Sequence, residues 1–301
     1  MNLRLGTRRS ALALAQSGMM ARALEALHPG LTVDLVPFVT QGDRLPGDLA
    51  KVGGKGLFTA ELEAGLLDGS LDLAVHSLKD LPVRSPDGLV VAAYPERADA
   101  RDVLVSEVAT RVAELPHEAR VLTGSLRRQA QLLALRPDLV VQPVRGNVET
   151  RIRKWRAGGV AATILAAAGM ARLGITDAPA HPIDPAELLP APGQGILAVQ
   201  VRRGGRAEEL CRALDHGPTA AAARAERAVV AAFGGDCTLP LAAWARQRED
   251  GGAITLAALL AAADGSELVR ADATAATPEA AAEAVVAPLR ARGAERVLAS
   301  L

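Results

Sequence analysis

Cysteine is nearly absent from this sequence. Only Cys211 and Cys237 occur among 301 residues, and their separation excludes the C-x-x-C spacing of a redox or zinc motif. No disulfide framework is expected, and a reducing cytoplasm is the expected location. The stretch RLGTRRSALALAQS imitates a secretory leader, but its unbroken apolar run, residues 11–15, is shorter than the roughly 7 to 15 residues of a signal-peptide core.

Long apolar runs and aromatic residues are also scarce. No run approaches the roughly 20 residues that a membrane span needs, so no membrane partner is expected. Aromatic residues make up 2% of the chain, too few for the stacking surfaces that bind single-stranded nucleic acids. The five histidines show no helical ligand spacing, and the cysteines lie far apart, so no metal site is predicted.

The residues that are present indicate a globular protein with a local anion site. Half of them are hydrophobic and no low-complexity tract occurs, which predicts two or three domains. Positive and negative charges balance at 34 each, yet nine basic and two acidic residues lie between Arg120 and Arg156. Such a segment indicates a site for an anion. On composition alone, a solvated helix face explains it equally well.

A faint internal repeat predicts two similar α/β lobes. The stretches LRLGTRRSALALAQSGMMARALEALHPGLTVDLVPFV and ARVLTGSLRRQAQLLALRPDLVVQPV share a strand, a turn with paired arginines, a helix and a second strand. A later strand follows each copy, LDLAVHS in the first and VAATILAAAG in the second. The pairs Arg8 and Arg9, and Arg127 and Arg128, fall at helix starts, where free backbone N–H groups favour carboxylates or phosphates. We expect the lobes to face each other across a cation-lined cleft.

The remainder of the chain has a different pattern. From about Gly217 a helix, three strands and a second helix predict a small α+β domain with Cys237 in its first loop. The stretch GQGILA, residues 193–198, has the glycine spacing of a dinucleotide fingerprint, but it runs into the alternating strand ILAVQVR and opens no helix. KVGGKGLF lacks the first glycine and the Ser or Thr of a phosphate-binding loop. Neither motif predicts a nucleotide.

The stretch LDLAVHSLKDLP places polar residues at the end of an apolar strand, just before Pro82. The C-terminal ends of strands are where α/β lobes bind ligands. Pro82 favours an extended Leu81, which helps to define the turn. Taken alone, Lys79 and Asp80 are explained at least as well by an ordinary surface turn.

Seven stretches together resemble the hydroxymethylbilane synthase family, also called the porphobilinogen deaminases. In the family's order, from residue 3 to about residue 245, they are GTRRSALALAQ, LAKVGGKGLFTAELE, DLAVHSLKDLP, GSLRRQAQL, VRGNVETRI, LPAPGQGILAVQVR and AERAVVAAFGGDCTLPLAA. The resemblance implies two lobes similar to periplasmic binding proteins, residues 1–95 with 190–212 and residues 96–189. It also implies a C-terminal cofactor-attachment domain, residues 213–301. No coiled-coil seam occurs, and a monomer is expected.

The activity implied by the resemblance is the tetrapolymerisation of porphobilinogen to hydroxymethylbilane, with release of ammonia, in the biosynthesis of heme and other tetrapyrroles. The family builds the product on a dipyrromethane cofactor held by a cysteine, which falls on Cys237. The family's catalytic acid falls on Asp80, which would assist the leaving amine and then stabilise the cation that develops. A cleft with six pyrrole rings would hold about twelve carboxylates, whose repulsion requires nearby cations.

The positions that match the family's binding residues are mostly basic, as carboxylate ligands require. The cofactor-binding matches are Lys79, Ser125, Arg127, Arg128, Arg145 and Arg151. The substrate-binding matches are Arg8, Ser10, Arg172, Lys51, Lys55 and Phe58, although Phe58 is explained equally well as a core residue. Glycines around Lys51 and Lys55 predict a mobile loop that closes over the site.

Two positions depart from the family's pattern. Gly124 stands where a second serine is common, so one hydroxyl contact is missing. Asp236 replaces a glycine before Cys237, and its charge would disfavour the thiolate needed for attachment.

Two other classes of protein share part of this pattern. A non-catalytic two-lobed protein that binds a small polyanion would also have duplicated lobes and a basic cleft, but it gives Cys237 no role. An RNA-binding protein that uses residues 120–156 would show a steep dependence of affinity on salt. Intact mass separates these classes, because only the enzyme carries two linked pyrroles.

Overall fold

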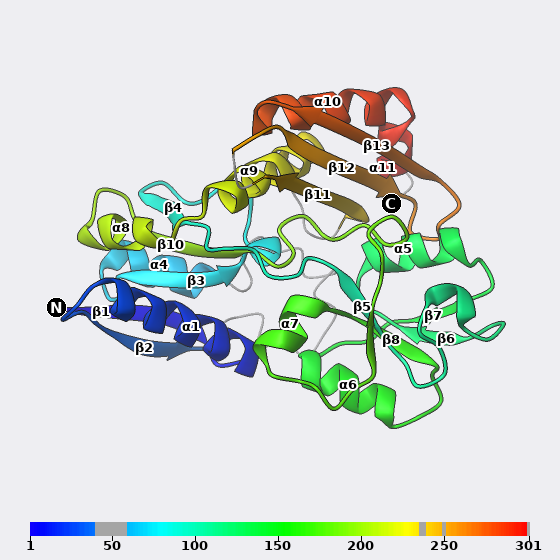
Figure 1. Ribbon diagram of the computed structural model, residues 1–301, viewed down its shortest axis with the longest axis horizontal. Coiled ribbons are helices and arrows are strands. Elements are labelled where there is room, and N and C mark those ends of the chain that lie inside the picture. The colour runs from blue at the N-terminus through cyan, green and yellow to red at the C-terminus, as the bar shows by residue number, and fades with distance from the viewer. Residues whose placement is uncertain (40–58, 235–238, 249–250, 300–301) are drawn as a thin grey trace.

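The structure is a computed structural model of the 301-residue chain that describes residues 1–39, 59–234, 239–248 and 251–299. Three sheets organise these residues, two with five strands and one with three. In Figure 1 the two larger sheets lie side by side and the smaller one lies above them. The predicted class, two α/β lobes with a small α+β part, is therefore confirmed.

The first five-stranded sheet combines strands from distant parts of the chain. Its strands are β1 (Asn2–Arg8), β2 (Thr32–Phe38), β3 (Leu73–Ser77), β4 (Leu89–Ala93) and β10 (Leu197–Arg202). In the order β2-β1-β3-β10-β4, β1 runs parallel to β2 and β3, whereas β10 runs antiparallel to β3 and β4. The accompanying helices are α1 (Ala11–Leu27), α4 (Ala60–Asp68) and α8 (Arg206–Cys211). Leu3 and Leu5 of β1 share a core with Leu24 of α1, since alternate strand residues point to the same face.

The second five-stranded sheet repeats this arrangement. Its strands are β5 (Asp102–Val105), β6 (Arg120–Leu122), β7 (Val140–Gln142), β8 (Ala162–Ala166) and β9 (Ala180–Pro182). The order is β7-β6-β8-β5-β9, with β6 parallel to β7 and β8, and β5 antiparallel to β8 and β9. The helices are α5 (Leu126–Leu135), α6 (Val148–Arg156) and α7 (Ala167–Arg172). The same order and directions in both sheets confirm the internal repeat, although the strand expected over VAATILAAAG ends at Ala166 and the next residues begin α7.

The chain passes between the two lobes twice, through residues 94–101 and 183–196, and each passage leads into the antiparallel strand of a lobe. In the second passage Gly193 has φ of 74°. A Cβ there would lie 2.8 Å from Leu78 Cγ and 3.0 Å from the backbone nitrogen of Lys79. The glycine therefore allows two backbone segments to approach closely. The residues that follow form β10 and not a helix, whereas the glycines of a dinucleotide-binding motif lead into a helix.

The third part of the chain forms a three-stranded antiparallel sheet that is covered on both faces. Its strands are β11 (Leu241–Gln247), β12 (Ile254–Ala261) and β13 (Leu268–Ala275), and its helices are α9 (Gly217–Ala232), α10 (Pro278–Ala291) and α11 (Ala294–Ala299). Leu256 and Leu260 pack with α9 and α10 on one face. Leu259 on the other face packs with Ala130 of α5 and with Leu189. Both faces are thus buried, which explains the nearly continuous apolar run of β12.

The elements of the third part match the sequence prediction except for α11, which was not predicted. The domain limits after residues 95, 189 and 212 stay a prediction. Over the ranges that the structure describes, no helix is both long enough and apolar enough to cross a membrane.

Candidate active site

Two arginines at the start of α5 share one buried carboxylate. Ser125 caps the helix by accepting a hydrogen bond from the Arg128 backbone nitrogen at 3.4 Å. The Arg127 Nη2 atom lies 2.8 Å from Asp102 Oδ2, and the Arg128 Nη2 atom lies 2.8 Å from Asp102 Oδ1. Asp102 begins β5 and is 0% exposed, and each arginine is 4% exposed. Burial acts to raise the pKa of Asp102, but the charges of both arginines hold it well below its usual range.

The remaining guanidinium donors of this pair are directed mainly at backbone carbonyls. Arg127 Nη1 donates to Leu189 O at 2.7 Å, and Arg128 Nη1 donates to Ile164 O at 2.9 Å. With two cations and one carboxylate, the cluster keeps one net positive charge. The two arginines are therefore less free to bind ligands than the sequence suggested, and Asp102 is a site residue that sequence reasoning missed.

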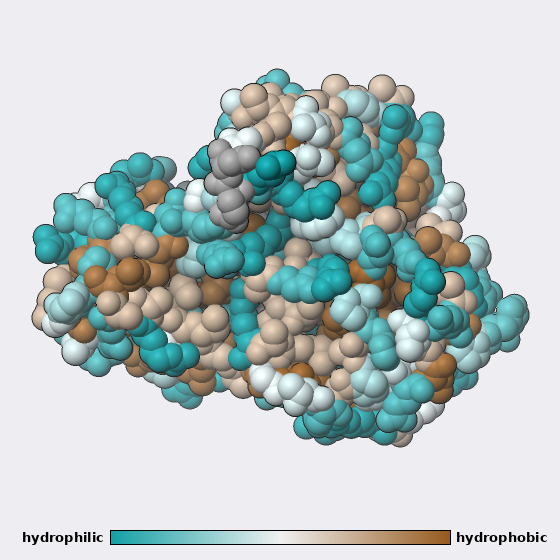
Figure 2. Space-filling view, viewed as in Figure 1, coloured by the Kyte–Doolittle hydropathy of each residue, from teal (hydrophilic) through white to brown (hydrophobic). Residues whose placement is uncertain are grey.

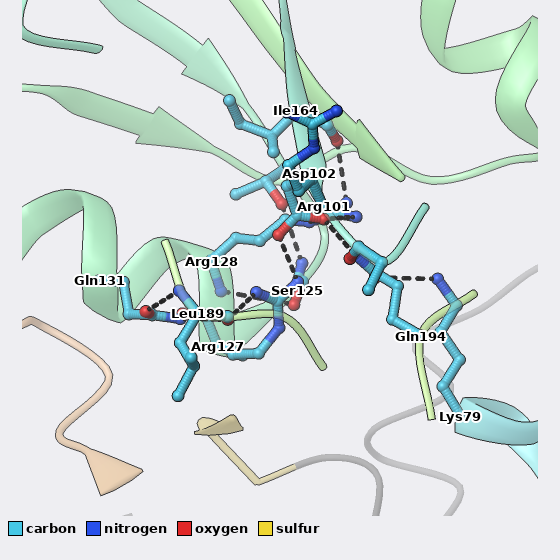
Figure 3. Close-up of polar contacts among 12 residues, drawn as sticks. Lys79, Arg101, Asp102, Ser125, Arg127, Arg128, Gln131, Ile164, Leu189 and Gln194 are labelled. Atoms are coloured by element: carbon cyan, nitrogen blue, oxygen red, sulfur yellow. Dashed lines mark hydrogen bonds and ion pairs between the residues drawn. The ribbon is translucent and has the colours of Figure 1, made fainter. Parts of the chain in front are cut away.

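A hydrogen-bond chain connects this cluster to the first lobe through Gln194 (Figure 3). Gln194 Nε2 donates to Asp102 Oδ1 at 2.8 Å and to Ala100 O at 2.8 Å. The Lys79 ammonium donates to Gln194 Oε1 at 3.4 Å. Burial lowers the pKa of Lys79 to about 8, although the neighbouring Asp80 acts to raise it. Cations of both lobes are thus connected through Gln194 and Asp102.

Asp80 lies at the end of a short 3-10 helix, η1 (Leu78–Asp80), directly after β3. Its side chain is exposed, whereas Leu78 is buried and donates its backbone N–H to Ile196 O at 3.0 Å. Leu81 is extended, as its position before a proline predicted. Burial and the charge of Arg128 lower the pKa of Arg151 on α6, and Asp80 acts in the opposite direction. The acid of the first lobe therefore lies close enough to Arg151 of the second lobe for their charges to interact.

Two arginine side chains near this site present buried donors that no described residue accepts. They are the Nε atoms of Arg127 and Arg172. Arg172 ends α7 and donates through Nη2 to Gly195 O at 2.7 Å. Burial lowers the pKa of Arg172 to about 10, a value that still leaves it protonated at neutral pH. Unsatisfied buried donors on charged groups are costly, and a carboxylate ligand would satisfy them.

The other matched residues of the described ranges lie near the end of β1 or near the starts of α1 and α6. Arg8 ends β1 and is half-buried. Ser10 caps α1, and its hydroxyl oxygen accepts from the Ala13 backbone nitrogen at 3.3 Å. Arg145 is exposed in the turn before α6, and Arg151 Nε donates to Gly146 O at 2.9 Å. In Figure 2 hydrophilic residues gather along the middle of the face shown, between the two lobes and the third part.

Several predicted site residues lie outside the described residues. They are Cys237, Lys51, Lys55 and Phe58, together with Asp236 and the glycines of the predicted mobile loop, Gly53, Gly54 and Gly56. Cys211 is described and is fully buried. Burial raises the pKa of its thiol to about 12, so this cysteine is an inert core residue.

The departure at Gly124 has a structural cause. A Cβ atom at this position would lie 2.4 Å from the carbonyl oxygen of Val144. Because that atom belongs to the backbone, a serine would require the chain to move. The neighbouring turn is held by a hydrogen bond from the Ser125 backbone nitrogen to Thr123 Oγ1 at 3.2 Å. The second serine of the family's pattern therefore does not fit this backbone.

His76, in the same motif as Asp80, has a structural role. It is buried on β3, and its Nε2 atom lies 3.0 Å from Gln200 Oε1. Gln200 in turn donates to Glu63 Oε1 at 3.1 Å. Burial lowers the pKa of His76 to about 4, so the ring is neutral at neutral pH. Among the described residues, no group of three or more His, Cys, Asp or Glu side chains is placed to hold a metal ion.

Comparison with known proteins gives a consistent result over nearly the whole chain. A family model described as "Porphobilinogen deaminase, dipyromethane cofactor binding domain" matches residues 3–209, and one described as "Porphobilinogen deaminase, C-terminal domain" matches residues 220–292. The chain is 48% identical over 305 residues to the porphobilinogen deaminase of Syntrophotalea carbinolica, covering 99% of this chain and 96% of that protein. It is 47% identical over 300 residues to that of Moorella thermoacetica, covering 98% and 95%.

Solved structures show a weaker likeness. The periplasmic aliphatic sulphonate binding protein SsuA from Escherichia coli has a TM-score of 0.41 and 17% sequence identity, and the likeness covers 77% of this chain and 70% of that chain. A likeness with so low a TM-score and sequence identity gives no information about function.

Proposed function

Because this chain belongs to the porphobilinogen deaminase family, we propose that it converts porphobilinogen to hydroxymethylbilane with release of ammonia, on a dipyrromethane cofactor. The observation that supports this most directly is the meeting of an exposed acid, Asp80, with cations of both lobes. Lys79 precedes it in the first lobe, and the charge of Asp80 acts to raise the pKa of both Lys79 and Arg151, the latter in the second lobe. A reaction that expels an amine from a substrate with two carboxylates needs both kinds of group.

The residues present fit a bound polycarboxylate. The Asp102 cluster keeps a net positive charge, and the Nε atoms of Arg127 and Arg172 are buried donors that no described residue accepts. Carboxylates of a bound dipyrromethane would supply the missing acceptors. When bound, that group supplies the pyrrole carbon to which substrate units are joined. Lys79, Ser125, Arg127, Arg128, Arg145 and Arg151 are proposed to hold the cofactor, and Arg8, Ser10 and Arg172 to bind substrate.

Asp80 is proposed as the catalytic residue. Its carboxyl group gives a proton to the aminomethyl nitrogen of porphobilinogen as ammonia leaves. The carboxylate that results stabilises the positive charge that develops on the pyrrole. The 3-10 turn places this group beyond the end of β3, where its side chain is exposed to an incoming substrate.

Cys237 is proposed as the attachment point, through a thioether. The only other cysteine, Cys211, is buried in the first core with a raised pKa, and it cannot serve without unfolding of that core. Lys51, Lys55 and Phe58, which like Cys237 lie outside the described residues, are kept as proposed substrate contacts on the basis of their match to the family's motifs.

The division into lobes 1–95 with 190–212 and 96–189, and a third domain 213–301, is proposed on the same basis. Each segment holds the strands of one sheet. We also propose that the protein is a cytoplasmic monomer. The scarcity of cysteine supports the cytoplasm, and the lack of a coiled-coil or extended apolar seam in the sequence supports a monomer.

Intact mass and turnover test the proposal together. The purified protein should exceed its chain mass by two linked pyrroles and should consume porphobilinogen. Cys237→Ala should remove the added mass and the activity, and the matched variant Cys211→Ala should keep both. Active protein at the unmodified chain mass would refute the covalent cofactor. The rival two-lobed binding protein is not favoured, because relatives of 47–48% identity are named deaminases, and it would show neither added mass nor turnover.

A further inference from the structure

The segment that follows Asp80 is held by an arginine from the third part of the chain. Arg227 on α9 donates through Nη2 to Pro82 O at 2.9 Å and to Val83 O at 2.5 Å, and through Nη1 to Leu81 O at 3.5 Å. These carbonyls belong to the three residues directly after the 3-10 turn. Residues 81–88 form neither helix nor strand, so their carbonyls lack the regular donors of secondary structure.

The hydrogen bonds that Arg227 forms with described residues all go to backbone carbonyls. Burial lowers the pKa of Arg227, while the nearby Tyr94 acts to raise it, and a guanidinium remains protonated in such an environment. None of the ion pairs among the described residues includes Arg227. A planar group with several fixed donors is well suited to hold successive carbonyls of one turn.

The helix that carries Arg227 is itself anchored to both passages between the lobes. The neighbouring Glu226 is fully buried and forms an ion pair with Arg97 at 2.6 Å. Its carboxylate also accepts from the backbone nitrogens of Gly193 at 2.5 Å and Ala245 at 2.7 Å. Arg227 therefore acts from a helix whose position relative to the lobes is well determined.

Apolar packing joins the same two elements. Leu78 and Leu81, which flank Lys79 and Asp80, pack with Ala223 of α9 and with Ile196 and Ala198. The packing brings the turn against the helix, but it does not determine the orientation of the exposed Asp80. The hydrogen bonds from Arg227 to residues 81–83 restrain the backbone immediately after it.

We infer that Arg227 is a positioning residue for Asp80. Through Arg227, α9, the helix that precedes the proposed cofactor cysteine in the sequence, also orients the catalytic acid. The inference rests on the proposed role of Asp80. Its physical consequence is that loss of the Arg227 donors leaves the binding residues in place but loosens the turn. Misplacement of a reacting group by about 1 Å can cost about 10²-fold in rate.

The test uses Arg227→Gln, Arg227→Lys and the matched control Arg224→Gln, each shown by intact mass to carry the cofactor. Arg224 lies on the same helix, one turn earlier, and is exposed. Beside Arg227 lies an open cavity of about 410 Å³, and Pro82 and Val83 are only half-buried, so the shorter Gln side chain can be solvated and the variant should fold. We expect kcat of Arg227→Gln to fall about tenfold with KM little changed. Arg227→Lys should recover part of the loss, and Arg224→Gln should match the wild type.

Two further measurements separate positioning from general stability. Hydrogen exchange should accelerate at residues 78–83 in Arg227→Gln and stay unchanged in Arg224→Gln. In an Asp80→Asn background, Arg227→Gln should cause no further loss, because residues that act through one another are not additive.

Three results would overturn the inference. They are a wild-type kcat in Arg227→Gln, unchanged exchange at residues 78–83, and full additivity with Asp80→Asn. If Asp80→Asn alone turned over at the wild-type rate, the proposed role of Asp80 would fail, whereas the exchange measurement would still decide whether Arg227 holds the turn.

Discussion

Replacing Asp102 by Asn tests the buried cluster most directly. The substitution keeps the size of the side chain and removes its charge. Asp102 accepts four hydrogen bonds, one from Arg127, two from Arg128 and one from Gln194. In the variant two buried guanidinium groups lose their shared carboxylate, and the new amide N–H₂ group faces donors instead of acceptors.

The expected cost follows from burial and charge. Removing one partner of a buried ion pair costs about 3 to 5 kcal/mol, mainly because the other charge stays buried without compensation. Here one carboxylate serves two cations, each 4% exposed, so we expect a loss of about 5 kcal/mol. That is a large part of the ~5 to 15 kcal/mol that stabilises a typical domain.

Denaturant titration of the second lobe measures this loss. The chain has two tryptophans, of which Trp155 lies on α6 in the second lobe and Trp244 lies on β11. In a Trp244→Phe background, fluorescence reports the lobe that contains Asp102. The matched control is Asp99→Asn, which removes an exposed ion pair with Arg101 at 2.7 Å and should cost less than about 1 kcal/mol.

The denaturation midpoints of the two variants should differ clearly. Asp102→Asn should lower the midpoint strongly, and Asp99→Asn should lower it little. Equal midpoints for the two variants would show that the shared carboxylate does not stabilise the lobe, and the reasoning about the cluster would be wrong.

Three further predictions concern the active-site turn, the Gly124 turn and the buried histidine. Asp80→Asn should lower turnover by about 10²-fold or more, and Asp80→Glu should retain more activity, measured on protein shown by mass to carry the cofactor; near-normal turnover of the Asn variant would remove Asp80 from the mechanism. Gly124→Ser brings a Cβ to 2.4 Å from Val144 O and should cost about 1 to 3 kcal/mol, visible as a lowered Tm, and an unchanged Tm would contradict the clash. Burial lowers the pKa of His76 to about 4, below its unfolded value of about 6.5. The unfolded chain therefore binds more protons between these values, and stability should fall as pH drops through this window, by up to about 3 kcal/mol. His76→Gln should lack this part of the pH dependence, and an identical acid profile would exclude the histidine as its source.

The local pattern of the sequence determined the elements and their repetition. Apolar periodicity predicted a strand, a helix and a strand in each lobe, and both copies occur in sheets of the same order. The two arginine pairs lie at the starts of α1 and α5, as predicted. These features were accessible because helix and strand periods and the effect of a proline on the preceding residue act within a few residues. The family's motifs added the site residues, which no local rule contains.

The tertiary structure alone decided which of these residues interact. The paired arginines were predicted to face a ligand, but both contact Asp102, which lies 25 residues before Arg127. The amphipathic pattern of α9 did not indicate that Arg227 reaches the carbonyl of Pro82, 145 residues away. Strand β10 completes a sheet that begins at residue 2. Contacts of this kind have no period in the sequence, because they depend on how the three sheets pack and on where the chain passes between the lobes. The sequence therefore determined the lobes and the chemistry available to them, and only the packing of the lobes decided which charges remain for a ligand.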